Sequence, residues 1–402
     1  MYGAAESLNN ALDAELAVAK ALEDLGFTTE IMEVELELAS IETLPSRRPL
    51  LVFNLVDAIN CDGRFAPLVT ARLDAFGIAY TGCNTSALLK TLSKVGTKLK
   101  LRHAGLPTPE WSVDGNGLDR EMQVIVKALW EHGSLGLDKT SVMRCEEAQQ
   151  VLVARTLSHK TEHFAEAYID GREFNLSLLE HSSGVEVLPI AEILFEGLEA
   201  DAPKIVDFDA KWTPDSRVYI GTPRRFGLER SEPELAKKLK QLALASWNLF
   251  GLNGYARFNF RIDPTGKPFV IDVNPNPFLA QDAGFAAAAA EGQGEPLPAS
   301  MGKGQWIVEN LAWLSNEEFN LEALPADLLS GLNLGYVGFK ATEIAEAMGI
   351  TVEELFRANE AGQLRLENKP IKPEAGYDEG MLFRLSFGER YCVAQAAPSR
   401  SA

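Results

Sequence analysis

The segment from Gly254 to Phe278, GYARFNFRIDPTGKPFVIDVNPNPF, places polar side chains in a pattern that suits a nucleotide site. Two runs of alternating residues flank a Pro-Thr-Gly turn, which predicts an antiparallel hairpin. Side chains alternate between the faces of a strand. We therefore expect Ala256, Phe258 and Phe260 on one face and Arg257, Asn259 and Arg261 on the other. On the return strand, the same alternation predicts Phe269, Ile271 and Val273 on one face and Asp272 and Asn274 on the opposite face.

A turn centred on Thr265 and Gly266 would place Asn259 opposite Asp272 and Arg257 opposite Asn274. The hairpin would then present a cluster of oxygen ligands and one guanidinium. Oxygen ligands suit Mg²⁺, which takes one or two carboxylates and completes its shell with water and substrate phosphates. The pattern predicts the floor of a magnesium–nucleotide site. The alternative is an ordinary solvent-facing strand surface.

Size and composition limit the classes of function. A chain of 402 residues is long enough for roughly two to four subdomains. The 38 Lys and Arg against 57 Asp and Glu give a net charge of −19. This balance argues against a nucleic-acid partner, because binding a polyanion needs basic surface. An acidic protein that binds ATP must concentrate its few lysines locally.

Cysteine usage and hydropathy indicate the compartment. The four cysteines (Cys61, Cys83, Cys145 and Cys392) are far apart and form no CxxC pair, so neither a zinc site nor a disulfide framework is expected. No segment approaches the roughly 20 apolar residues that span a bilayer. The N-terminus also lacks the layout of a signal peptide. We expect a cytoplasmic protein with no membrane partner.

The elements that must position these residues alternate between strand and helix. Leu50 to Leu55 and Ile78 to Thr81 read as strands of a parallel α/β unit. Met122 to Ala128 reads as a strand, and Phe164 to Leu179 as a hairpin around Asp170 and Gly171. The expected helices are Leu12 to Leu25, Leu88 to His103 and Ser231 to Phe250.

From Gly3 to about Leu314, the chain resembles the D-alanine–D-alanine ligase branch of the ATP-grasp superfamily. Seven segments occur in the family's order: GIAYTGCNTSALLKTLSKVGTK, GLPTP, VIVKALWEHGSLG, EAYIDGREF, DFDAKW, GYARFNF and VIDVNPNP. The resemblance implies a mixed α/β and α+β protein with an ATP-grasp fold, an N-terminal parallel α/β domain and a small C-terminal helical/β extension. The expected domains are 1–87, the small ATP-grasp subdomain 88–170, the catalytic subdomain 171–316 and the extension 317–402.

The resemblance also implies roles for individual residues. Lys94 and Lys127 would contact ATP phosphates, and Lys211 the transferring γ-phosphate, since lysines act as point charges on phosphates. The loop from Glu131 to Leu137, with Ser134, would cover the triphosphate through backbone N–H groups. Taken without the family, Lys94 reads as a solvated helix face and the loop as a surface turn. The remaining assignments are Glu166, Tyr168 and Ile271 at adenine, Glu173 at ribose, Asn259, Asp272 and Asn274 at Mg²⁺, and Arg257 at the oxyanion formed when an amine attacks an acyl phosphate.

Departures from the family pattern bear on the substrate. Asp272 is the only carboxylate left in the metal set. Phe278 stands where the family has the glycine of NTxPG, and Ala283-Gly284 where it has the Ser-Leu that binds the second amino acid's carboxylate. An alanine side chain cannot donate to a carboxylate, so substrates other than D-alanine plus D-alanine are expected. Further substrate candidates are Glu6, Arg224 and Arg225. The two arginines would bind an acidic group of the substrate; the alternative is that they are ordinary surface charges. Gly133 and Trp212 replace a serine and a tyrosine.

The segment from Phe339 to Leu366 has the spacing of a helix-turn-helix with a wing. Its net charge of −2 (three basic and five acidic residues) argues against DNA binding and favours a packing, dimerisation or lid module. Two functions stay open. One is an ADP-forming ligase, requiring ATP and Mg²⁺, that joins a small carboxylate to an amine or amino acid; the family suggests a homodimer. The other is a non-catalytic ATP-binding regulatory protein.

Overall fold

The structure is a computed structural model of the 402-residue chain. It describes residues 3–131, 133–134, 136–181, 184–197, 202–213, 216–280 and 283–292, and the short stretches 351, 354, 365–366, 369–370, 382–387 and 390–395. For residues 3–13 and from 365 onward, only the backbone is described. The chain forms two compact units. The first comprises Met1–Thr43, Phe53–Val69 and Thr81–Leu311, and the second Leu44–Val52, Thr70–Tyr80 and Ala312–Ala402.

The first described helix, α1, spans Gly3–Asp24 and confirms the helix expected before Gly26. The helix expected from Leu88 to His103 is instead two helices, α4 (Thr85–Thr91) and α5 (Lys94–His103). Ser93 causes the break, because its hydroxyl accepts from the Gly96 N–H as an N-cap. Lys94 therefore becomes the first residue of a new helix. The other short helical segments are η1 (Ile41–Thr43), α2 (Leu44–Arg47), η2 (Gly63–Phe65) and α3 (Ala66–Phe76).

The two strands expected at Leu50 to Leu55 and Ile78 to Thr81 do not form as strands. A single parallel bridge between Val52 and Tyr80 joins the segments. The parallel direction was predicted correctly, but one bridge pair makes no sheet. Leu50 is also half exposed, at 50%, so the apolar run LLVFNL is not a fully buried strand.

A four-stranded antiparallel sheet has the order β1-β4-β2-β3. Its strands are β1 (Trp111–Ser112), β2 (Gln123–Ala128), β3 (Val142–Arg144) and β4 (His163–Ala167). The strand expected from Met122 to Ala128 is confirmed. Helix α6 (Cys145–His159) follows the short η3 (Lys139–Ser141) and buries Ala148 and Leu152 against Val124 and Val126.

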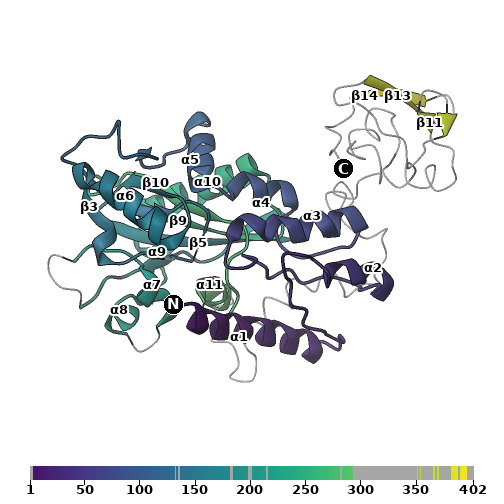
Figure 1. The fold of residues 1–402 in the computed structure, drawn as a ribbon, viewed down its shortest axis with the longest axis horizontal. Helices are drawn as coiled ribbons and strands as arrows, with labels where there is room; N and C mark the ends of the chain where they lie inside the picture. The colour runs from purple at the N-terminus through teal and green to yellow at the C-terminus, as the bar shows by residue number, and fades with distance from the viewer. Residues whose placement is uncertain are drawn as a thin grey trace. The chain divides into compact units, whose positions relative to one another are not determined.

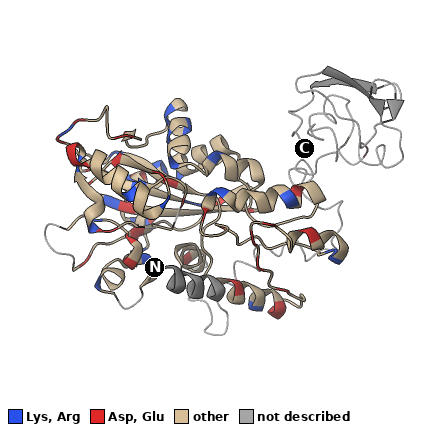
Figure 2. Ribbon diagram, viewed as in Figure 1, with Lys and Arg blue, Asp and Glu red and all other residues tan. Residues whose placement is uncertain are grey.

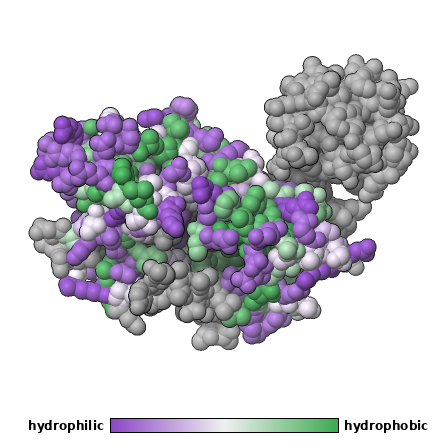
Figure 3. All heavy atoms as spheres, in the orientation of Figure 1, coloured by the Kyte–Doolittle hydropathy of each residue, from purple (hydrophilic) through white to green (hydrophobic). Residues whose placement is uncertain are grey.

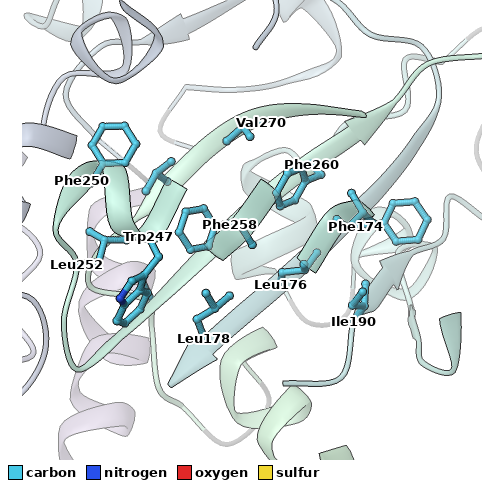
Figure 4. Packing of buried hydrophobic residues seen from close by; sticks show 14 of the residues in the cluster. Phe174, Leu176, Leu178, Ile190, Trp247, Phe250, Leu252, Phe258, Phe260 and Val270 are labelled. Carbon is cyan, nitrogen blue, oxygen red and sulfur yellow. The ribbon is translucent and has the colours of Figure 1, made fainter. Parts of the chain in front are cut away.

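The larger antiparallel sheet has the order β10-β9-β5-β7-β8, with β6 paired to β5. Figure 1 labels its strands β5, β9 and β10. These strands are β5 (Arg172–His181), β6 (Gly184–Val187), β7 (Ala191–Ile193), β8 (Arg224–Arg225), β9 (Tyr255–Ile262) and β10 (Pro268–Asn274). Helix α10 (Pro233–Phe250) covers one face, and its Trp247 and Phe250 pack with Phe174, Phe258 and Phe260 (Figure 4). Burying large apolar side chains of this kind stabilises the fold by about 1.5–3 kcal/mol each.

The hairpin expected from Phe164 to Leu179 is wrong. Its two arms, β4 and β5, belong to different sheets, and the turn at Asp170 and Gly171 carries the chain from one sheet to the other. Gly171 is required at this crossing because a Cβ there would lie 1.8 Å from the carbonyl oxygen of Ile262. The local sequence pattern resembles a hairpin because each arm is a strand. A hairpin and a crossing between sheets differ only in whether the two strands pair with each other.

The β9–β10 hairpin forms as predicted, with Asp272 opposite Asn259 and Asn274 opposite Arg257. A β-bulge between Val270 and Asp272 shifts the register by one residue. Near the turn, Phe269 is therefore opposite Arg261, and Val270 rather than Phe269 or Ile271 enters the core with Val273. The predicted faces hold on β9 and at Asp272, Val273 and Asn274. They fail at Phe269 and Ile271, because a bulge changes which side of the sheet the following residues face.

Four further short helices are described in the first unit: α7 (Phe208–Trp212), α8 (Arg217–Ile220), α9 (Leu228–Ser231) and α11 (Gly284–Gly292). Helix α11 packs its Phe285 and Ala286 against Leu179 and Tyr255. Across the face in view, Figure 3 shows hydrophilic residues interspersed with smaller hydrophobic areas. None of the described helices combines the length and hydropathy needed to cross a membrane.

In the second unit, strands β11 (Arg365–Leu366), β12 (Lys369–Pro370), β13 (Leu382–Phe387) and β14 (Arg390–Gln395) form an antiparallel sheet in the order β12-β11-β13-β14. The helix pair expected between Thr342 and Ala361 lies outside the described residues, apart from Thr351 and Glu354. The domain boundaries expected from the sequence stay predictions.

Candidate active site

The face of the larger sheet opposite α10 carries the polar residues of the hairpin. Asn175 is the register partner of Asn259, and Ser177 is the partner of Arg257. Asp272 and Asn274 continue this row on β10. Their neighbours along each strand are the apolar residues that pack on α10. Strict alternation on β5 and β9 thus separates a core face from a face that can do chemistry.

Several buried polar atoms on this face have no hydrogen-bond partner within the described part of the chain. They include the Nδ2 of Asn175, the Nε of Arg257 and the Oδ1 of Asn259, together with the Nζ of Lys94 from α5. Buried polar side-chain atoms are nearly always paired, and an exception calls for an explanation. Three donors and one acceptor without partners are what a site for an anion and a cation requires.

Lys211 is part of this cluster. Asp207 caps α7 by accepting from the N–H of Ala210 at 2.9 Å, which fixes the helical turn that carries Lys211. Burial first, and then the nearby charges of Arg257 and Lys94, lower the pKa of Lys211 to about 8, against the opposing effect of Glu131 and Asp272. Burial also lowers the pKa of Arg257. Cations held this close are stabilised when an anion binds among them.

A buried ion-pair triad lies on the other sheet. Glu166 on β4 pairs with Lys127 at 3.0 Å and with Lys98 of α5. Burial would raise the pKa of Glu166, but Lys127 and Lys98 outweigh it and hold the pKa below its usual range. Lys98 also donates to Thr108 Oγ1 at 3.1 Å, and Thr108 donates to the Val270 carbonyl at 2.9 Å. The triad therefore links α5, β2, β4 and β10.

Sequence reasoning did not select Lys98. It lies four residues after Lys94 in the same helix, and residues at this spacing share a helix face. The signal was therefore present in KVGTK, where the second lysine is as well placed as the first to face inward. Glu166 and Lys127, which were selected, contact each other directly.

The loop from Glu131 to Leu137 lies against the segment that leads into α7. The indole N–H of Trp212 donates to the Gly133 carbonyl at 2.9 Å, and the Ser134 hydroxyl donates to the Val206 carbonyl at 3.1 Å. The backbone N–H of Phe208 donates to the Leu137 carbonyl at 3.1 Å. His132 and Leu135 lie outside the described residues. The hydroxyl of Ser134 thus holds the loop to its neighbour in this structure.

Glu173 and Tyr168, expected at the ribose and the adenine, surround Arg261. Glu173 forms an ion pair of 3.0 Å with Arg261, and both side chains are buried. The guanidinium of Arg261 lies 5.9 Å from the ring centre of Tyr168. Ile271 sits at the bulge, outside the apolar cluster of Val270 and Val273. Ile271 is half-buried, and its place at the adenine stays a prediction.

The two arginines of the predicted acidic-group site point to opposite faces. Arg225 is the register partner of Glu192 and donates to it at 2.5 Å, and Glu192 also binds Arg172. Arg224 is the partner of Ile193, on the face of Glu173 and Asn175. Arg225 is thus engaged in an ion-pair network away from the hairpin's polar residues, whereas Arg224 shares their face.

Of the two other predicted substrate residues, Phe278 has described side-chain contacts and Glu6 does not. Phe278 packs edge-on against Trp212, with ring centres 5.3 Å apart, beside Ala280 and Ala283. Two of the family departures, Trp212 and Phe278, are therefore in contact with each other. The side chain of Glu6 lies outside what the structure describes of α1.

The donor set fits a magnesium ion. The Oδ1 of Asn259 is a buried oxygen without a partner, and its register partner Asp272 supplies a carboxylate. Asn274 Oδ1 accepts from the Asn276 N–H at 2.9 Å and retains a second lone pair. No group of three or more His, Cys, Asp or Glu residues suited to a metal occurs among the described residues. A site of one carboxylate and amide oxygens suits Mg²⁺ that shares its shell with phosphates.

Comparison with known proteins adds independent findings. The family model described as the D-ala D-ala ligase C-terminus matches residues 119–294. A protein of Sinorhizobium fredii (strain NBRC 101917 / NGR234), described as uncharacterized protein y4sG, is 31% identical over 283 residues, which cover 68% of this chain and 81% of that protein. A D-alanine–D-alanine ligase of Aquifex aeolicus (strain VF5) is 29% identical over 302 residues, covering 72% and 93%.

A solved structure is similar in fold. The crystal structure of D-alanine–D-alanine ligase from Bacillus anthracis matches with a TM-score of 0.54 at 17% identity, and the match covers 76% of this chain and 93% of that one. At this identity the likeness concerns the fold alone.

Proposed function

This chain belongs to the D-alanine–D-alanine ligase-like family, as a divergent member with an ATP-grasp fold, and on that premise we propose that it is an ADP-forming carboxylate–amine ligase. The family relationship supports an ATP-dependent ligase that forms C–N bonds. The proposal adds the acyl-phosphate route, the magnesium ion and substrates other than D-alanine plus D-alanine. We also propose that it works in the cytoplasm, where ATP is available, with a homodimer as the expected assembly.

One observation carries the proposal: the unpartnered buried atoms of Lys94, Arg257 and Asn259 share a cluster with Lys211 and Asp272. A non-catalytic nucleotide-binding protein needs contacts to the phosphates. It does not need a further guanidinium, such as that of Arg257, for an oxyanion formed in the reaction. Phosphoryl transfer is accelerated mainly by positioning and charge neutralisation, and this cluster supplies both.

The proposed chemistry has two steps. A carboxylate oxygen of the acid attacks the γ-phosphorus of ATP, the bond from phosphorus to the β–γ bridging oxygen breaks, and an acyl phosphate and ADP result. The amine then attacks the acyl carbon, loses a proton and expels inorganic phosphate to leave the amide. Lys211 and Lys94 would neutralise the phosphates, and Arg257 the oxyanion of the second step. Asn259, Asp272 and Asn274 would hold Mg²⁺, which screens phosphate charge when bound.

Changes around the substrate region support a departure from D-alanine dimerisation. The side chain of Ala283 has no hydrogen-bond donor, and Phe278, whose ring contacts Trp212, packs beside it. A site whose side chain hydrogen-bonds the substrate rejects analogues that cannot form this bond. A site that lacks this donor no longer selects for the substrate group that accepts it.

The test is phosphate release from ATP with Mg²⁺, screened over pooled acids and amines, with the product identified by mass. We expect at least one acid–amine pair to stimulate release and to yield a product lighter than the sum of its parts by one water. Arg257→Ala should lower this turnover by at least about 100-fold, as loss of an oxyanion donor does, while ATP still binds. Tight ATP binding without stimulation by any pair would instead favour the non-catalytic alternative.

A further inference from the structure

A second arginine lies on the polar face of β9. Arg261 is four residues beyond Arg257 on this strand, so alternation places both side chains on one face, about 14 Å apart along the strand. Arg261 is buried, with 5% of its surface exposed. Neither step of the proposed reaction uses it. A guanidinium carries five N–H donors, and a buried one needs partners for them.

The partners of Arg261 come from two kinds of structure. Two belong to the sheet and its approach: Glu173 on the neighbouring strand β5 pairs with Arg261 at 3.0 Å, and the Gly171 carbonyl accepts from its Nη1 at 3.0 Å. The third is the carbonyl of Lys204, which accepts from Nη2. Lys204 lies in a segment that forms neither helix nor strand before α7 begins at Phe208. Arg261 therefore fastens irregular backbone to the sheet.

This segment, residues 204–211, leads from Arg261 to the reaction centre. At its start, the N–H of Lys204 also donates to the hydroxyl of Tyr168 at 2.9 Å. At its end, Lys211 interacts electrostatically with Arg257 and Asp272. The segment thus begins beside one arginine of β9 and ends beside the other, so that it follows the polar face of the strand.

The position of Lys211 depends on how this segment is held. Ordering irregular backbone costs conformational entropy, so the segment stays in one place only through the contacts along it. Near its middle, Val206 and Phe208 bond to the loop from Glu131 to Leu137, which is itself irregular. The bond from Arg261 is the one that reaches back to a buried side chain of the larger sheet.

We propose that Arg261 is a positioning residue for Lys211: by holding the Lys204 carbonyl, it fixes residues 204–211 along the polar face and keeps the Lys211 ammonium where the γ-phosphate of ATP binds. The inference rests on the proposed function and deepens it. A lysine at position 261 would keep the charge beside Glu173. Its single ammonium lacks the planar fork that reaches a carboxylate and two carbonyls at once.

The test compares the affinities of ATP and ADP for the full chain with Mg²⁺, measured by calorimetry without acid or amine. Only ATP carries a γ-phosphate, so the ratio of the two affinities reports the contact of Lys211. We expect the unaltered chain to bind ATP about tenfold or more tightly than ADP, as one charged hydrogen bond provides. Lys211→Met should remove most of this preference, and Arg261→Lys should reduce it severalfold.

A double variant shows whether Arg261 acts through Lys211. Once Lys211→Met is present, adding Arg261→Lys should not lower the ATP preference further, because changes that remove one shared interaction are not additive. Tyr168→Phe removes the other bond to Lys204 and should also reduce the preference. This second variant decides the question if Arg261→Lys does not fold.

The matched control is Arg172→Lys. Arg172 lies on β5 immediately before Glu173 and is also held by carboxylates, those of Glu192 and of Glu232 at the start of α10. It has no contact with residues 204–211 among those described. The ATP preference should therefore stay unchanged in this variant.

Three results would overturn the inference: no ATP preference in the unaltered chain, an unchanged preference in Arg261→Lys, or an effect of Arg261→Lys that persists in Lys211→Met. The phosphate-release assay separates this inference from the proposed function. Turnover on some acid–amine pair, with the ATP preference unchanged by Arg261→Lys, would refute the positioning role and keep the ligase. A preference reduced by Arg261→Lys, with no turnover on any pair, would keep the positioning role and refute the ligase.

Discussion

At the scale of single residues, the hairpin shows what alternation alone can predict. Arg257, Asn259, Asp272 and Asn274 were expected to lie opposite one another in pairs, and the register places them so. Arg225 shows the reverse: a pair of adjacent arginines cannot both face one site in a strand, and only the pairing with Glu192 reveals which one turns away. Lys98 was missed although its spacing from Lys94 places both on one helix face, because the spacing alone does not show that this face is buried.

Lys211 leads to a prediction on pH dependence. Its pKa, lowered to about 8 mainly by burial, means that the free protein loses this positive charge as the pH rises through 8. If the ammonium contacts the γ-phosphate, kcat/KM for ATP should fall above that pH and reach a plateau below it. Lys211→Arg keeps the charge, since arginine stays protonated over this range. The alkaline fall should therefore move to higher pH in the variant. The same fall in both proteins would rule out Lys211 as its origin.

At the scale of helices and strands, buried ion pairs connect elements that sequence patterns treat separately. Lys98 is buried at 2% exposure, as is Glu166. Lys98→Met should lower the free energy of unfolding by about 3 kcal/mol, because removing one partner leaves a buried charge poorly compensated. Urea denaturation measures this change.

The same helix offers the control for that measurement. Lys100 is exposed, and Lys100→Met should alter stability by less than about 0.5 kcal/mol, as surface substitutions usually do. Equal effects of the two variants would show that Lys98 and Glu166 do not stabilise each other.

The loop from Glu131 to Leu137 provides a second element-scale prediction. Trp212→Phe keeps an aromatic ring against Phe278 but removes the indole N–H that donates to Gly133. Loss of one hydrogen bond of about 1 kcal/mol should raise amide exchange in this loop severalfold and KM for ATP about fivefold. Trp111→Phe, on β1, is the matched control. Unchanged loop exchange in Trp212→Phe would show that other contacts hold the loop.

Element pairing is where sequence reasoning failed most. The strands of the β9–β10 hairpin, β2 and helix α10 were predicted because each is locally consistent. The pairing of β4 and β5 with other strands depends on Gly171 passing close to Ile262, a contact between residues 91 positions apart. The bulge at Ile271 likewise has no signature in the alternating pattern. Both features follow from tertiary contacts, which a local pattern does not contain.

At the scale of the whole molecule, an acidic chain gathers basic groups at one site. The net charge is −19, and Figure 2 shows acidic and basic residues interspersed along the described part of the ribbon. Lys211 nevertheless interacts electrostatically with Lys94 and Arg257, and Arg257 with Arg224, while Asp272 interacts with both Lys211 and Arg257. The expectation that an acidic ATP-binding protein concentrates its cations locally therefore agrees with this structure. The overall composition of the chain does not reveal this local gathering of cations.

The most direct test of the proposed function follows one oxygen atom. Acids that stimulate phosphate release would be labelled with ¹⁸O in the carboxyl group and incubated with the amine, ATP and Mg²⁺, and the products examined by mass spectrometry. An acyl phosphate transfers one carboxyl oxygen to phosphate when the amine attacks, so the account predicts ADP and inorganic phosphate carrying a single ¹⁸O. Label in AMP, unlabelled phosphate, or no turnover with any acid would contradict it.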